Sequence, residues 1–184
     1  SDVIVVIGAN PTSNHPVAAS FIKNAAENGA ELIVIDPRRN GLENYAGHFL
    51  QFTPGSDVAL LNALLNVIIE EELFDRQYVE AQTEGFQALS EHIKSFTPDK
   101  MSPLCGISAD ELRTVARKIS RARAAMIFWG MGIAQSTHGT DNARCLISLA
   151  LICGHIGRRG AGLHPLRGQN NVQGASDAGL IPMM

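Results

Sequence analysis

The chain has 184 residues, of which 45% are hydrophobic and 18% are charged, and its formal net charge is −3. This composition indicates a globular domain, because it is too apolar for a disordered chain and too interrupted by polar residues for a membrane-spanning one. The slight negative charge gives no overall field that would attract nucleic acid or anionic lipid. We therefore expect neither nucleic-acid binding nor direct membrane insertion.

Three cysteines, Cys105, Cys145 and Cys153, lie far apart in the sequence. Their spacing contains no CxxC pair, so it predicts neither a disulfide framework nor a local iron–sulfur or zinc site, and it favours a reducing compartment. We expect a cytoplasmic location, with a periplasmic parent protein as the alternative. The chain enters an apolar strand at its third residue and stops without a capping pattern, which we interpret as a piece of a longer protein.

Apolar runs and stripes predict alternating strands and helices along most of the chain. Short apolar runs predict strands at 3–7, 31–35, 47–52 and 124–129. Apolar positions at helical spacing predict helices at 17–28, 58–71, 108–121 and 142–153, with two or three small helices within 75–94. Ser108 and Glu111 have the spacing of a capping box, in which the hydroxyl accepts from the first turn and the acid reaches back.

Strands that alternate with helices predict an α/β fold, here a three-layer, mostly parallel Rossmann-like sheet with helices on both faces. We assign residues 1–156 to this α/β domain. In residues 157–184 glycine, asparagine and glutamine dominate and the apolar period ends, so we expect a polar loop segment there.

Ligands of an open parallel sheet bind beyond the carboxyl ends of its strands, so the loops after the strands are the candidate sites. GANPTSNHP (8–16) lacks the GxGxxG pattern of an ordinary NAD site, but small and hydroxyl residues before a helix can bind phosphate. A capped surface turn explains this loop equally well. DPRR (36–39) offers a carboxylate for ribose hydroxyls or a guanine edge and an arginine for phosphate, and a solvated charged turn is the alternative.

The remaining loops carry further candidates. In TPGSD (53–57), Gly55 exposes the backbone, and Asp57 is either a ligand residue or a helix N-cap. The two glycines of GMGIAQ (130–135) would let a ligand approach the backbone, unless the methionine between them is a core residue. The segment 163–175 places four amides and Arg167 in a glycine-rich stretch, which favours recognition over a linker role, and a guanidinium suits a small carboxylate.

Taken together, these loops resemble those of the molybdenum or tungsten bis-pyranopterin oxidoreductases, specifically the catalytic subunit of formate dehydrogenases. The segments that carry the resemblance are VIGANPTSNHP (6–16), VIDPRR (34–39), TPGSDVALLNA (53–63), WGMGIAQSTHGT (129–140) and PLRGQNNVQGASD (165–177). They span essentially the whole chain in the family's order. Most are similar across the wider family, whereas RGQNNVQGA is similar to the formate dehydrogenase form.

The resemblance implies that the chain is the α/β domain that holds one of two molybdopterin guanine dinucleotides. It implies that the nucleotide and pyrophosphate lie against Asn10, Ser13, Asp36, Arg38, Gly55 and Asp57. It places Met131, Gln135 and Gln169 nearer the pterin, and Arg167 at the carboxylate of formate beside the metal. It implies no metal ligand within this chain, because the ligating cysteine or selenocysteine and a [4Fe-4S] cluster belong to a preceding part of the parent protein.

The resemblance further implies an oxidoreductase, a formate dehydrogenase that converts formate to carbon dioxide at a molybdenum or tungsten centre. Formate would be the substrate, electron-transfer subunits would be the partners, and the domain alone would be inactive. One alternative is another molybdopterin oxidoreductase such as nitrate reductase. A second is a non-catalytic α/β nucleotide-binding or scaffold module.

Overall fold

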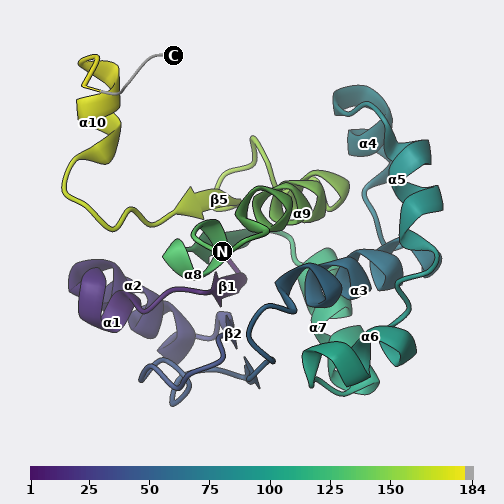
Figure 1. Cartoon of the computed structure of the whole chain (residues 1–184), viewed down its shortest axis with the longest axis horizontal. Coiled ribbons are helices and arrows are strands. Elements are labelled where there is room, and N and C mark those ends of the chain that lie inside the picture. The colour runs from purple at the N-terminus through teal and green to yellow at the C-terminus, as the bar shows by residue number, and fades with distance from the viewer. Residues whose placement is uncertain (181–184) are drawn as a thin grey trace.

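The computed structural model describes residues 1–180 and contains one sheet of five parallel strands (Figure 1). The strands are β1 (Val3–Ile7), β2 (Glu31–Ile35), β3 (His48–Leu50), β4 (Ala125–Trp129) and β5 (Gly162–Pro165). They lie in the order β3-β2-β1-β4-β5, which is the doubly wound order: the chain builds outward from β1 to one edge, then returns to the other side of β1. The point where the order reverses lies between β1 and β4.

Helices cover both faces of the sheet. They are α1 (Pro11–Asn14), α2 (Pro16–Glu27), α3 (Asp57–Glu70), α4 (Arg76–Gln82), α5 (Phe86–Ile93), α6 (Pro98–Cys105), α7 (Ala109–Arg121), α8 (Met131–Ala134), α9 (Gly139–Ile152) and α10 (Val172–Asp177). Alternate residues of β1 enter two separate cores, because successive side chains of a strand point to opposite faces. Val5 packs in the larger core with α3, α7 and α9, and Val6 packs in the smaller one with Ile22 of α2. The predicted three-layer α/β fold is confirmed.

Helix α3 is the centre of the larger core. Eleven of its fourteen residues are buried, so the helix is covered on nearly every side rather than along one stripe. It contacts α5, α6, α7 and α9. Two asparagines in this apolar helix each make a side-chain hydrogen bond within the protein: Asn66 Nδ2 donates to the Ile93 carbonyl at 3.1 Å, and Asn62 Oδ1 accepts from the Cys145 thiol at 3.3 Å.

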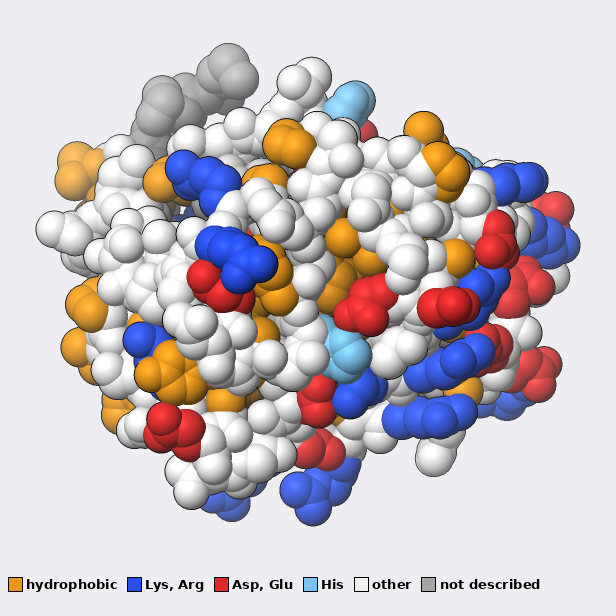
Figure 2. Space-filling view, turned by 90° about the horizontal axis from the view of Figure 1, so that it is seen from below, with side chains coloured by type: hydrophobic (Ala, Val, Ile, Leu, Met, Phe, Trp, Pro, Cys, Tyr) orange, Lys and Arg blue, Asp and Glu red, His pale blue; other side chains and the backbone are white. Residues whose placement is uncertain are grey.

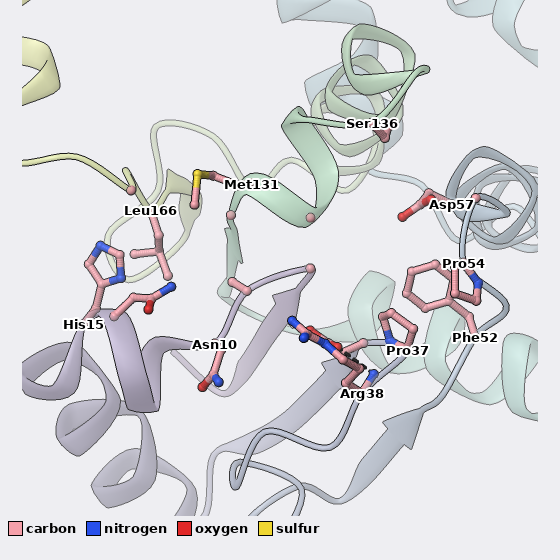
Figure 3. Close-up of a pocket in the computed structure, with 18 residues that line it drawn as sticks. Asn10, His15, Pro37, Arg38, Phe52, Pro54, Asp57, Met131, Ser136 and Leu166 are labelled. Carbon is pink, nitrogen blue, oxygen red and sulfur yellow. Dashed lines mark hydrogen bonds between the residues drawn. The ribbon is translucent and has the colours of Figure 1, made fainter.

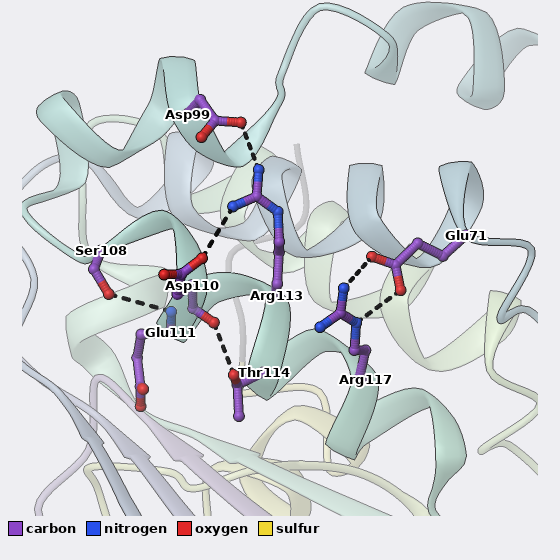
Figure 4. Close-up of polar contacts among 8 residues, drawn as sticks. All are labelled: Glu71, Asp99, Ser108, Asp110, Glu111, Arg113, Thr114 and Arg117. Carbon is purple, nitrogen blue, oxygen red and sulfur yellow. Dashed lines mark hydrogen bonds and ion pairs between the residues drawn. The ribbon is translucent and has the colours of Figure 1, made fainter.

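Polar contacts attach α7 to its neighbours (Figure 4). Ser108 Oγ accepts the Glu111 N–H at 3.2 Å, which confirms half of the predicted capping box. The other half is wrong, because the Glu111 carboxylate binds His48 Nδ1 at 2.6 Å and so ties α7 to β3. Arg117 donates two hydrogen bonds to Glu71, at 2.8 and 2.7 Å, and this bidentate pair fixes α7 against the end of α3.

Charges of both signs are interleaved on the surface. Figure 2 shows Lys and Arg side chains beside Asp and Glu over the face it views. In the part of the chain that the structure describes, no helix combines the length and the apolar character needed to cross a bilayer.

Several elements differ from the expectations, among them the short helices α1 and α8 in stretches expected to be loops. Helix α6 was not expected, because it contains Pro103 and buries only Pro98 and Cys105, so its sequence lacks an apolar stripe. Residues 157–184 are not all loop, since they supply strand β5 and helix α10. Strand β5 has four residues, includes glycine and proline, and is held by backbone pairing with β4, so no side-chain pattern marks it.

We predict that Leu64→Ala in α3 lowers the free energy of unfolding by about 2–5 kcal/mol, because Leu64 is fully buried and its loss leaves a cavity. The matched change Ile147→Ala on α9, where the side chain is 41% exposed, should lower it by about 1 kcal/mol or less. Urea unfolding followed by circular dichroism measures both. Equal losses in the two variants would contradict the central place of α3.

Candidate functional site

The loops after all five strands meet in one cleft at the carboxyl edge of the sheet (Figure 3). The cleft has a volume of about 310 Å³, at the lower end of the roughly 300–1,000 Å³ typical of small-molecule sites. Its lining residues, in chain order, are Gly8, Ala9, Asn10, Asn14, His15, Asp36, Pro37, Arg38, Phe52, Pro54, Gly55, Asp57, Gly130, Met131, Gly132, Ser136, Leu166 and Gly168. The cleft therefore lies at the topological switch point, where ligands of this architecture bind.

The floor of the cleft is a close contact between the backbones after β1 and β4. The Gly132 N–H donates to the Gly8 carbonyl at 3.0 Å, and a Cβ on Gly132 would lie 2.7 Å from that oxygen. A Cβ on Gly130 would lie 3.0 Å from the Ala9 Cβ. The glycines of GMG thus allow two protein backbones to approach, which the sequence analysis did not anticipate. Met131 between them is 39% exposed and lines the cleft, so the alternative of a core methionine is wrong.

Asp36 places a nearly buried carboxylate at the end of β2. It is 8% exposed, and its Oδ1 accepts the Arg38 N–H at 2.8 Å. Burial raises the pKa of Asp36, while the Arg38 N–H, the Arg38 charge and the Asn40 amide oppose the shift. The bond to the backbone holds the carboxylate at the rim of the cleft, where it can accept further hydrogen bonds from a ligand.

Asp57 supplies a second buried carboxylate at the start of α3, after strand β3. It is 6% exposed, and its side chain extends from the start of α3 toward the cleft (Figure 3). Burial raises the pKa of Asp57, opposed by its own backbone N–H. The alternative N-cap role is wrong, because Ser56 is the N-cap and Asp57 is the first helical residue. Gly55 beside it has a φ of +85° and open space around its Cβ direction, so a ligand has access to the backbone there.

Six of the predicted site residues come together in the cleft. They are Asn10, Asp36, Arg38, Gly55, Asp57 and Met131. Four others, Ser13, Gln135, Arg167 and Gln169, are exposed and do not line it. Arg167 nevertheless lies between Leu166 and Gly168, which both do.

Sequence reasoning missed several lining residues. Phe52 is 5% exposed and reads as the end of a strand, and Ser136 lies one residue beyond the GMGIAQ loop. His15 and Leu166 lie within the candidate loops 8–16 and 163–175, but neither residue type predicted a specific contact with a ligand. Figure 3 shows His15, Met131 and Leu166 on one side of the cleft, opposite Asp57.

No cluster of three or more His, Cys, Asp and Glu side chains that could hold a metal ion occurs among residues 1–180. The three cysteines are unpaired thiols. Burial raises the pKa of Cys145 to about 11 and that of Cys153 to about 12, so both thiols are protonated at neutral pH.

We predict that Gly132→Ala destabilises the protein by about 1–3 kcal/mol, because the new Cβ would overlap the Gly8 carbonyl and force the two loops apart. Gly174→Ala in α10 is the control, since the atoms nearest its Cβ belong to the movable side-chain amide of Asn171 rather than to backbone, and alanine favours a helix. Thermal unfolding of both variants measures the difference. A Gly132→Ala protein as stable as the control would contradict the close contact.

We predict that Asp57→Asn stabilises the cofactor-free protein at pH 7. Because folding raises the pKa of Asp57, the folded protein holds this proton more tightly than the unfolded chain, and ionisation at higher pH favours unfolding. The advantage should fade as the pH falls below the ordinary value of 3.8, where both states are protonated.

Denaturant unfolding at neutral and acidic pH tests this, with Asp141→Asn on α9 as the control, because that side chain is 56% exposed. An Asp57→Asn variant that is less stable than the unaltered protein at pH 7 would show that ionised Asp57 stabilises the fold.

Comparisons with known proteins identify the family. Residues 1–182 match the family model described as molybdopterin oxidoreductase. The F420-dependent formate dehydrogenase subunit alpha of Methanocaldococcus jannaschii is 45% identical over 182 residues, which is 99% of this chain and 27% of that protein. Formate dehydrogenase H of Escherichia coli is 43% identical over 182 residues, 99% of this chain and 26% of that protein.

The chain thus spans about a quarter of the length of these curated relatives. Among solved structures, acetylene hydratase from Pelobacter acetylenicus is similar with a TM-score of 0.83 and 30% sequence identity. That similarity covers 87% of this chain and 22% of the other. Because the family model matches nearly the full length, this chain belongs to the molybdopterin oxidoreductase family.

Proposed function

We propose that the chain is the domain of a formate dehydrogenase that holds one molybdopterin guanine dinucleotide of a bis-dinucleotide molybdenum or tungsten cofactor. One observation carries the proposal: loops from all five strands converge on a single cleft at the switch point, and two buried carboxylates, Asp36 and Asp57, line it. Membership of the molybdopterin oxidoreductase family supports the kind of ligand, and the formate dehydrogenase names of the two curated relatives support the reaction.

The chemistry of the cleft fits a guanine nucleotide. Asp36 and Asp57 are acceptors, and guanine and ribose present N–H and O–H donors. Hydrogen-bond donors of a ligand would stabilise the ionised carboxylates and so oppose the effect of burial, which raises the pKa of both. Arg38 lines the same cleft, and its guanidinium can donate two hydrogen bonds to the pyrophosphate. Gly55 has no side chain, so the ligand can also reach the backbone there. In the proposal Asn10 and Ser13 also lie along the nucleotide.

The other end of the cofactor would lie near Met131, Gln135 and Gln169. Met131 lines the cleft, whereas Gln135 and Gln169 are exposed in this domain, as Arg167 is. We assign these exposed residues to the surface that faces the rest of the parent protein. That part would supply the ligating cysteine or selenocysteine and a [4Fe-4S] cluster, and the domain alone would not turn over formate.

In this proposal, Arg167 binds the substrate. Oxidation of the formate anion to carbon dioxide releases two electrons and one proton, and the bound cofactor supplies the metal centre that accepts the electrons. The guanidinium of Arg167 can pair with both carboxylate oxygens, which leaves the C–H bond of formate directed away from the arginine. Fixing this orientation lowers the entropic part of the barrier without chemical participation of the arginine.

The proposed partners are electron-transfer subunits of the parent enzyme. The proposed compartment is a reducing one such as the cytoplasm, which the unpaired thiols Cys105, Cys145 and Cys153 suit.

Analysis of the full-length protein tests the function. We expect molybdenum or tungsten, guanine nucleotide released by acid hydrolysis, and formate-dependent reduction of an artificial electron acceptor. Nitrate and sulfoxides are the comparison substrates. Turnover of nitrate without turnover of formate would favour the nitrate reductase alternative, and the absence of both metal and guanine would favour a scaffold module.

We predict that Arg167→Lys in the full-length enzyme lowers kcat/KM for formate by about 100-fold or more. The positive charge remains, but the bidentate hydrogen bonding to the formate carboxylate is lost. Metal and guanine content should be unchanged. Arg159→Lys, the same chemical change at an exposed position before β5, should have no effect. Steady-state kinetics with formate measure both variants, and near-normal turnover of Arg167→Lys would refute the assignment.

A further inference from the structure

Asn40 is a buried polar residue that lies behind the cleft without lining it. It is 9% exposed and follows β2 in the loop that carries Asp36 and Arg38. All four of its polar groups have partners within the protein. The side-chain Nδ2 donates to the Ala9 carbonyl at 3.1 Å, and Oδ1 accepts the Leu42 N–H at 3.2 Å.

The backbone of Asn40 is bonded on both sides as well. Its N–H donates to Glu43 Oε2 at 3.0 Å, and its carbonyl accepts from Thr12 Oγ1 at 2.7 Å. The bonds to Ala9 and Thr12 join residues 31 and 28 positions apart in the sequence. Asn40 therefore connects the loop after β2 to the loop after β1.

No strand pairing holds these two loops together at this point. The β1–β2 ladder ends at the pair Ile7 and Ile35, and the last backbone bond beyond it runs from the Gly8 N–H to the Ile35 carbonyl at 3.0 Å. Farther out, the hydrogen bonds described between the two loops are those of Asn40, beside the apolar packing of Ala9 against the core cluster that contains Leu42. These two bonds therefore tie the wall of the cleft after β1 to the wall after β2.

The connection reaches the lining residues directly. Ala9 lines the cleft, and Thr12 Oγ1, which donates to Asn40, also contacts the side chain of Asn10. On the other wall, the Asn40 amide is one of the groups that act on the Asp36 carboxyl. Leu42, held by Asn40 Oδ1, is fully buried in the smaller core and anchors the loop there.

We propose that Asn40 is a positioning residue for the dinucleotide, which sets the separation between the wall with Ala9 and Asn10 and the wall with Asp36 and Arg38. The inference rests on the proposed function, because it presumes that the cleft holds the cofactor. An amide suits this position, since it presents a donor to Ala9 and an acceptor to Leu42 at the same time. A serine is too short to reach both.

The test compares Asn40→Ser with Asn66→Ser in the full-length enzyme. Asn66 is a matched control: it is 3% exposed, and its Nδ2 also donates to a backbone carbonyl at 3.1 Å, but it lies in α3 away from the cleft lining. Both variants should show a lower thermal midpoint, because each loses a buried hydrogen bond. Only Asn40→Ser should lose the dinucleotide faster than the unaltered enzyme does.

Retention of the dinucleotide is measured as GMP released by acid hydrolysis per polypeptide after repeated desalting. We expect Asn40→Ser to lose GMP about tenfold faster than Asn66→Ser, the size of effect typical of residues that orient direct ligands. Activity per polypeptide should fall in proportion to the retained GMP, while KM for formate stays unchanged, because Asn40 does not touch the substrate position.

Thr12→Val is a second, nearly isosteric variant that removes the hydroxyl and with it the contacts to the Asn40 carbonyl and the Asn10 side chain, and it should also speed the loss of GMP. If Asn40→Ser and Thr12→Val retain GMP as well as Asn66→Ser does, the positioning role is wrong. If the unaltered enzyme contains metal but no guanine nucleotide, the proposed function is itself overturned. Failure of the positioning role is therefore detected in the variants, and failure of the proposed function is detected in the unaltered enzyme.

Discussion

The close contact between Gly8 and Gly132 is the constraint on which the cleft depends. β1 and β4 are adjacent and in register, so their loops leave the sheet at the same level and must diverge above it. The Gly132 N–H bond to the Gly8 carbonyl holds them together at the base, and side chains at these positions would block the approach. The cleft lies above this contact, at the switch point of the sheet.

Two buried carboxylates in the cleft suit the binding of a ligand but lower the stability of the protein when the cleft is empty. Asp36 and Asp57 are each less than one-tenth exposed, and burial raises the pKa of both. An ionised carboxylate in such a place is unfavourable for an empty protein and favourable for one whose ligand supplies donors. Packing of the larger core offsets this loss of stability. Helix α3, which begins at Asp57, is the most completely buried of the described helices, so the core fixes the position of the acid.

The sequence predicted the sheet and six of the cleft residues because their signals are local. A β-branched run such as 3–7 and a polar turn directly after it specify both a strand and a site at its end. The rest depends on contacts distant in sequence. Strand β5 exists through pairing with β4, the glycines at 130 and 132 serve a contact with Gly8, and Asn40 bonds residues about thirty positions away. No pattern within a short window contains that information.

The exposed and lining residues divide the proposed cofactor site into two parts. Asp36, Arg38 and Asp57, assigned to the nucleotide end, are held by the sheet, by α3 and by backbone bonds such as that from Arg38 to Asp36. Arg167 and Gln169, assigned to the reactive end, follow the edge strand β5 and are exposed. A nucleotide end built within one domain can anchor the cofactor before the reactive end is complete. In the proposed function, the place of Arg167 on an edge segment would let the rest of the parent protein determine its orientation, and formate binding would then require assembly of the whole centre.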